Sequence, residues 1–118
     1  MSVVTLTMSN FRNEVLESER PVVVDFYADW CGPCHQVAPV LEELSSKLDG
    51  TVRFVKVDID ESPDIARAYG ILSIPTIILF EDGEAKSRVT GAAPAHVMER
   101  ELDLAAVPEG GDHVDFRA

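Results

Sequence analysis

The segment Val22–Ala28, with the sequence VVVDFYA, constrains the fold more than any other part of the chain. β-branched and aromatic residues favour strands, and a nearly unbroken apolar run is typical of a strand with both faces buried. Such a strand needs neighbouring strands at its edges and helices over its faces. The segment therefore predicts an α/β sheet with this strand in its interior.

Shorter β-rich and amphipathic segments alternate around this strand. Further strands are predicted at residues 3–6, 52–57, 76–80 and 85–90, and Asp82-Gly83 is typical of a hairpin turn. Helical spacing of apolar residues predicts a helix capped by Ser9, a helix from the Cys31 region to about Leu48 with a kink at Pro39, a helix from Pro63 to Gly70 capped by Ser62, and a helix from Pro94 to about Ala105. This order predicts helices on both faces of the sheet.

The two cysteines of the chain, Cys31 and Cys34, lie close together in the sequence Cys-Gly-Pro-Cys. A disulfide between them would restrict little of the unfolded chain, so a stapling role is disfavoured. Cys31 lies where a strand ends and a helix begins, and free N–H groups at a helix N-terminus favour the reactive thiolate. Cys34, one turn further on, can attack a mixed disulfide formed by Cys31. The spacing therefore predicts a dithiol redox site.

Two other readings of the cysteine pair stay open at this point. One is half of a zinc site, but zinc commonly takes four ligands and the chain has no second cysteine pair. Its histidines do not have the usual spacing: His35 adjoins Cys34 too closely, and His96 and His113 lie elsewhere. The other reading is an inert disulfide.

Trp30-Cys31-Gly32-Pro33-Cys34, placed after a hydrophobic strand, resembles the active site of the thioredoxin family. The resemblance covers roughly residues 3–106, because further segments typical of the family follow in its order: Val24–Ala28, Lys56–Asp58, Tyr69–Ile71, Ile74–Thr76, Asp82-Gly83 and Gly91. It implies a thioredoxin-like α/β fold with a central mixed sheet of about five strands flanked by four helices. We expect this domain to span residues 1–107 and a flexible acidic tail to span residues 108–118.

The resemblance also implies a role for individual residues. Cys31 corresponds to an exposed nucleophile and Cys34 to a buried resolving thiol. Asp25 corresponds to the carboxylate that accepts and returns the Cys34 proton through water, and Lys56 to its ionic partner. The remaining positions shape the active site or border the substrate groove: Trp30, Gly32, Pro33, the Ile74 backbone, a cis-Pro75 and Gly91.

Asp25 and His35 can also be weighed on physical grounds. An ionised carboxylate is costly within an apolar strand, so burial raises the pKa of Asp25, and a nearby ammonium lowers it. A carboxyl group balanced in this way can transfer a proton near neutral pH, although it could also be purely structural. His35 stands where thioredoxins usually carry Lys or Arg. A histidine that is mostly neutral near pH 7 would make the site less positive and change reductase docking, but His35 could equally be a solvated helix residue with no role.

The chain has 21 acidic and 10 basic residues, a net charge of −11. This charge disfavours nucleic acid as a partner, and only three basic residues are lysines, which raises the hypothesis of a protein adapted to high salt. No signal peptide is recognisable and no run approaches the ~20 apolar residues of a membrane helix. We therefore expect a cytoplasmic, monomeric protein without a membrane partner.

The resemblance implies a protein-disulfide reductase that maintains cytosolic thiol redox balance without a cofactor or metal ion. Its expected partners are disulfide-containing client proteins and thioredoxin reductase, which restores the dithiol. Gly-Pro between the cysteines favours reduction, because related oxidases and isomerases more often carry His there. Two alternatives stay open: a binding module without turnover, and a disulfide oxidase or isomerase with a less negative redox potential.

Overall fold

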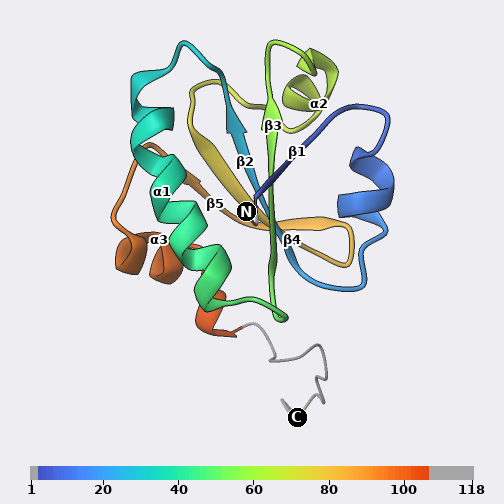
Figure 1. Ribbon diagram of the computed structural model, residues 1–118. Coiled ribbons are helices and arrows are strands. Elements are labelled where there is room, and N and C mark those ends of the chain that lie inside the picture. The colour runs from blue at the N-terminus through green and yellow to red at the C-terminus, as the bar shows by residue number, and fades with distance from the viewer. Residues whose placement is uncertain (1–2, 107–118) are drawn as a thin grey trace.

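The computed structural model describes residues 3–106, which form one five-stranded mixed sheet (Figure 1). The strands are β1 (Val4–Leu6), β2 (Val22–Tyr27), β3 (Arg53–Asp58), β4 (Thr76–Glu81) and β5 (Glu84–Thr90), in the spatial order β1-β3-β2-β4-β5. β1, β3 and β2 are parallel, whereas β4 and β5 run antiparallel to their neighbours. The central place predicted for the apolar run is confirmed, because β2 is the middle strand and four of its side chains are fully buried.

The helical elements are η1 (Arg12–Leu16, a π-helical turn), α1 (Gly32–Lys47), α2 (Pro63–Ala68), α3 (Ala95–Glu101) and η2 (Leu104–Ala106, a 3₁₀ turn). α1 and α3 lie on one face of the sheet, whereas η1 and α2 lie on the other (Figure 1). This arrangement confirms the α/β fold with helices on both faces. The predicted tail at residues 108–118 lies outside the described residues.

The two faces of β2 contact different hydrophobic cores, as the alternation of side chains along a strand requires. Val23 packs with α1 and α3, in a core that also includes Val37, Leu41, Leu44, Phe54, Ile77, Leu79, Met98 and Leu102. Val22, Val24 and Phe26 pack toward η1 and α2, with Leu6, Phe11, Val15, Val55, Val57, Ile65, Ile78 and Phe80. Asp25 shares the parity of Val23, so the carboxyl group lies on the face covered by α1.

The hairpin predicted at Asp82-Gly83 is confirmed. Both residues have positive φ angles, of 53° and 79°, and they join Glu81 directly to its β5 partner Glu84. Two successive positive φ angles match the right-handed twist of the paired strands. A Cβ atom on Gly83 would lie 2.9 Å from the carbonyl oxygen of Leu16, so glycine is required here for space as well as conformation.

Two of the predicted helix starts differ from the structure in their capping. Ser9 does not cap η1, which begins after Phe11, because the Ser9 hydroxyl lies 2.9 Å from that of Thr7. Ser62 does occupy the N-cap position of α2, but its side chain makes no capping hydrogen bond. At Ser9, a neighbouring side chain therefore competes successfully for the hydroxyl that the sequence pattern assigns to the helix.

The long helix α1 ends at Lys47, next to its predicted end at about Leu48, and includes Pro39. The last helix differs in detail from expectation. α3 ends at Glu101, and the remainder of the predicted helix is the separate turn η2. Asp103 lies between them with a φ angle of 63°, a left-handed conformation that ends an α-helix.

Candidate active site

Cys31 is the N-cap residue of α1, at the junction between the central strand and the longest helix. Its backbone is extended, with φ −94° and ψ 113°, and Pro33 lies in the first helical turn. The backbone N–H of Cys34 donates a hydrogen bond to Cys31 Sγ over 3.2 Å. The sulfur therefore takes the place of a capping oxygen, at the positive end of the helix dipole.

Cys31 and Cys34 form a disulfide with their Cα atoms 5.3 Å apart. Cys31 is 5% exposed and Cys34 is 4% exposed, so the expectation that only Cys34 is buried is wrong for this disulfide form. The cause is a small apolar cluster in which Ala28, Tyr27 and Ile74 pack around both cysteines. Gly32 and Pro33 between them are exposed, and a Cβ atom on Gly32 would meet no atom within 4 Å.

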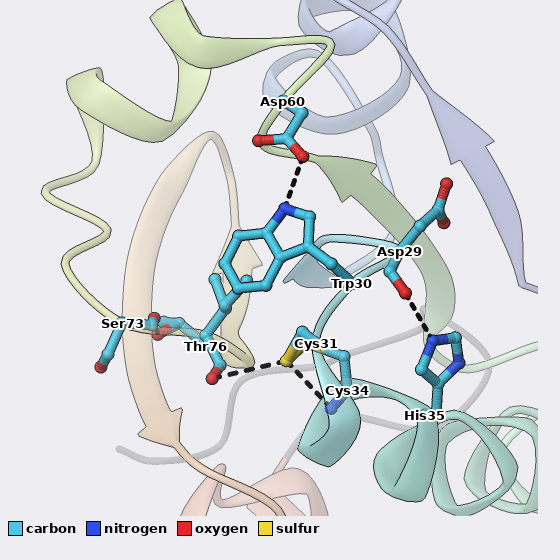
Figure 2. The surroundings of a disulfide bond; sticks show 9 residues. Asp29, Trp30, Cys31, Cys34, His35, Asp60, Ser73 and Thr76 are labelled. Carbon is cyan, nitrogen blue, oxygen red and sulfur yellow. Dashed lines mark hydrogen bonds between the residues drawn. A yellow bond between two sulfur atoms is a disulfide. The ribbon is translucent and has the colours of Figure 1, made fainter.

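A second loop, from a distant part of the sequence, reaches the disulfide (Figure 2). The Ile74–Pro75 peptide bond is cis, the isomer that the resemblance implies. The carbonyl oxygen of Ile74 lies 3.8 Å from Cys31 Sγ. The N–H of Gly91 donates to the Pro75 carbonyl over 2.8 Å. The fold thus brings Ile74, Pro75 and Gly91 together next to the nucleophile position.

The indole of Trp30, next to Cys31 in the chain, is 69% exposed. Its Nε1–H donates to Asp60 Oδ2 over 2.7 Å (Figure 2). The N–H of Asp60 in turn donates to Asp58 Oδ1 over 2.8 Å. Asp60 is not among the residues predicted for the site from the sequence. Its proximity to Trp30 could have been predicted, because β2 and β3 are parallel and the residues that follow them meet at one edge of the sheet.

His35 connects the two ends of the cysteine motif (Figure 2). His35 Nε2 lies 2.7 Å from the carbonyl oxygen of Asp29. A carbonyl can only accept, so Nε2 carries the proton and donates this bond. The hydrogen bond ties the first turn of α1 to the residue that precedes Trp30, a contact that the sequence did not indicate.

Asp25 is 4% exposed, and its buried Oδ1 has no hydrogen-bond partner among residues 3–106. Burial, offset in part by the attraction of the Lys56 ammonium, raises the pKa of Asp25 from its ordinary value of 3.8 to about 7. A buried carboxyl group in this state can take up and release a proton at neutral pH.

Lys56 lies beside Asp25 in the parallel register of β2 and β3. Among the described residues the ion pairs within 4.0 Å do not include Lys56, but its charge acts on Asp25 and lowers the pKa of the carboxyl group. The Lys56 ammonium instead lies over the ring of Tyr27, 5.0 Å from its centroid. This cation–π contact draws the charge toward Tyr27, and Asp25 feels Lys56 only at longer range.

Residues 3–106 contain neither a metal-binding cluster nor a membrane-spanning helix. These residues contain no group of three or more His, Cys, Asp and Glu side chains gathered closely enough to hold a metal ion. The same part of the chain has no helix with the length and apolar character needed to cross a bilayer.

Comparisons with known proteins agree with this geometry. The family model Thioredoxin matches residues 2–103. Thioredoxin 1 of Nostoc sp. is 46% identical over 98 residues, which cover 83% of this chain and 92% of the relative. Thioredoxin 1 of Synechococcus elongatus is 48% identical with the same coverage, and thioredoxin of Rickettsia felis is 52% identical over 86 residues, 73% of this chain and 82% of the relative. The chain therefore belongs to the thioredoxin family, and its Cys31–Cys34 pair makes it a thiol–disulfide oxidoreductase.

Proposed function

We propose that the chain reduces disulfide bonds in client proteins and is returned to its dithiol form by thioredoxin reductase. The position of Cys31 Sγ carries this proposal, because the sulfur caps α1 and accepts the Cys34 N–H. The same N–H would stabilise a Cys31 thiolate once the disulfide is reduced. The relatives named thioredoxin support a disulfide-reducing function for this chain.

The exchange conserves atoms and electrons in two steps. The Cys31 thiolate attacks one sulfur of the client disulfide, which forms a mixed disulfide and releases the first client thiolate. The Cys34 thiolate then attacks Cys31 Sγ, which closes the Cys31–Cys34 disulfide and releases the second client thiolate. Both client thiolates take up protons, and the reductase later supplies two electrons and two protons to the chain.

Asp25 is proposed as the base for the second step. Cys34 must lose its thiol proton before it can attack, and Asp25 lies on the sheet face covered by α1, the helix that carries Cys34. A pKa of about 7 allows Asp25 to accept the proton through a water molecule and return it later. Lys56 would moderate this pKa through its charge, without touching the carboxylate.

The client segment is proposed to lie between Trp30 and the loop that ends at cis-Pro75. Trp30, Ile74, Pro75 and Gly91 border this groove, and Gly32 and Pro33 leave the approach to the sulfur open. The Cys31–Cys34 dithiol carries the two electrons that pass to the client, so the proposed reaction needs no further cofactor or metal ion. We place the protein in the cytoplasm as a monomer, where both of its cysteines can act in thiol redox balance.

The test uses reduced protein, insulin as client and thioredoxin reductase as regenerating enzyme. We expect the chain to accelerate insulin reduction, Cys31→Ser to abolish the acceleration, and Cys34→Ser to accumulate a covalent complex between Cys31 and the client. Wild-type protein that binds clients without accelerating reduction would support a binding module instead. A redox potential near that of disulfide isomerases, about −180 mV, would support an isomerase.

A further inference from the structure

Leu72 is almost completely exposed, at 96%, in the loop between α2 and β4. Single exposed apolar residues are common on protein surfaces and need no explanation by themselves. Leu72 differs because of its position, two residues before the Ile74 carbonyl that faces Cys31 Sγ at 3.8 Å. Its exposure also does not come from a disordered apolar loop, since Ile71 and Ile74 on either side pack against the cores.

Three hydrogen bonds, each accepted by a backbone carbonyl of α2 or its C-cap, fix the loop at its α2 end. The Arg88 guanidinium reaches from β5 and donates to the Tyr69 carbonyl over 2.8 Å. Ile71 N donates to the Ala66 carbonyl over 3.0 Å, and Gly70 N donates to the Arg67 carbonyl over 3.2 Å. These bonds close the last turn of α2 and fix the direction in which the chain leaves it.

The loop is equally fixed at its β4 end. Thr76 Oγ1 donates to the Ser73 carbonyl over 2.7 Å, and the Gly91 N–H holds the Pro75 carbonyl. Leu72 therefore projects from a short segment anchored on both sides. A side chain presented in this way loses little conformational freedom when a partner covers it, so its burial contributes to binding.

We propose that Leu72 is a specificity-determining residue, which selects client disulfides that have an apolar side chain close to the reacting cysteine. The inference rests on the proposed function. A client sulfur that reaches Cys31 Sγ must pass beside the Ile74 carbonyl, which places the flanking client residues along the loop that carries Leu72. The exposed indole of Trp30, held by Asp60, supplies a second apolar surface at the site.

The charge of the chain further defines the preferred client. Asp29 precedes Trp30 in the sequence, Asp60 accepts a hydrogen bond from the Trp30 indole, and the net charge is −11. Acidic client segments would be repelled, whereas neutral or basic segments with an apolar residue would be favoured. The preferred client is therefore a protein whose reactive cysteine is flanked by apolar, non-acidic residues.

The test compares synthetic peptide disulfides that differ at one position. Leucine replaces serine in turn at each of the three positions on either side of the reactive cysteine, and kcat/KM for reduction is measured with each peptide. For at least one position we expect wild-type protein to prefer leucine about fivefold, the effect of removing part of a leucine side chain from water. Leu72→Ser should abolish this preference, and Leu72→Met should retain it.

Two controls separate recognition from chemistry. Leu72→Ser should leave the redox potential and the reduction rate by dithiothreitol unchanged, since neither requires a client side chain. Met8→Ser removes another exposed apolar side chain, on the surface between η1 and α2, and should leave the leucine preference intact. Loss of the leucine preference in both Leu72→Ser and Met8→Ser would overturn the proposal.

The outcomes also distinguish this inference from the proposed function. If wild-type protein reduces all peptides at equal rates, or if Leu72→Ser slows leucine and serine peptides equally, Leu72 does not select clients. If wild-type protein reduces none of the peptides and does not reduce insulin, the proposed reductase function fails instead.

Discussion

Asp25 couples protonation of the active site to the stability of the fold. Its pKa is raised from 3.8 to about 7 by burial, so between these values the folded chain holds a proton that the unfolded chain has released. Stability therefore falls as pH rises through this window, and the loss is complete above about pH 7. Each unit of raised pKa corresponds to about 1.4 kcal/mol, so the total is a few kcal/mol.

Asp25→Asn should remove this pH-dependent loss. We expect the variant to be more stable than wild-type protein by a few kcal/mol at pH 8 and to differ much less at pH 4, in urea unfolding of the oxidised proteins. Asp64→Asn, at an exposed carboxylate on α2, provides the control and should behave as wild type at pH 8 apart from its surface ion pair. Equal unfolding of Asp25→Asn and wild-type protein at pH 8 would contradict a buried, charged carboxylate.

The same substitution should slow the reaction. Without the Asp25 carboxylate the Cys34 thiol must lose its proton to solvent, and loss of a general base typically slows a step by about 10²-fold or more. Trp30 is the one tryptophan of the chain and adjoins the disulfide, so its fluorescence can follow single turnovers between pH 6 and 9. We expect the wild-type rate to rise with pH around 7 and the variant to lose this inflection. Matching pH profiles would remove Asp25 from the reaction.

At the level of single residues, the reactive groups could be recognised from the sequence, whereas the contacts around them could not. The cysteine spacing and the acidic residue within an apolar run were visible because each is a local departure from its surroundings. The hydrogen bonds of Trp30 to Asp60 and of His35 to Asp29 could not be predicted, because they depend on where the strands end and on the side-chain rotamers. Similarly, the burial of Cys31 depends on Ile74, which is distant in sequence.

At the level of elements, the hairpin between β4 and β5 offers a direct test of local geometry. Gly83 and Gly50 both have positive φ angles, but only Gly83 has a close neighbour at its missing Cβ position, the Leu16 carbonyl. Gly50→Ala should therefore lose about 1 kcal/mol of unfolding free energy from conformation alone. Gly83→Ala should lose about 2–4 kcal/mol, because the backbone of η1 must also move. Equal losses in thermal or urea unfolding would contradict the contact with η1.

Elements with a strong pattern were predicted within a few residues, and those with competing local interactions were not. β2 was recognisable because it is buried on both faces, and the Asp-Gly hairpin because few residues accept positive φ angles. The first helix was misplaced at Ser9, whose hydroxyl bonds Thr7 instead of capping. The last helix was predicted as one continuous helix because the apolar periodicity continues through Asp103, although the backbone of Asp103 has a left-handed conformation.

At the level of the whole molecule, the dominant feature is an excess of negative charge. The described ion pairs involve six basic residues: Arg12, Arg53, Lys47, Arg67, Lys86 and Arg100. With 21 acidic residues in the chain, most carboxylates are left to repel one another across the surface. Compaction brings these charges together, so their repulsion favours the unfolded chain at low ionic strength.

Salt should therefore stabilise the protein, and most strongly at low concentrations. The Debye length falls from about 30 Å at 0.01 M salt to about 10 Å at 0.1 M, so most of the repulsion is screened within this range. We expect the midpoint of thermal unfolding to rise between 0.01 and 0.3 M sodium chloride and then more slowly toward 1 M. Glu19, Glu43 and Asp49 are exposed and belong to none of the described ion pairs, so their joint replacement by glutamine and asparagine should raise stability at 0.01 M and weaken the response to salt. A midpoint that does not change with salt, or a triple variant with the wild-type salt response, would show that surface repulsion does not limit the stability of this fold.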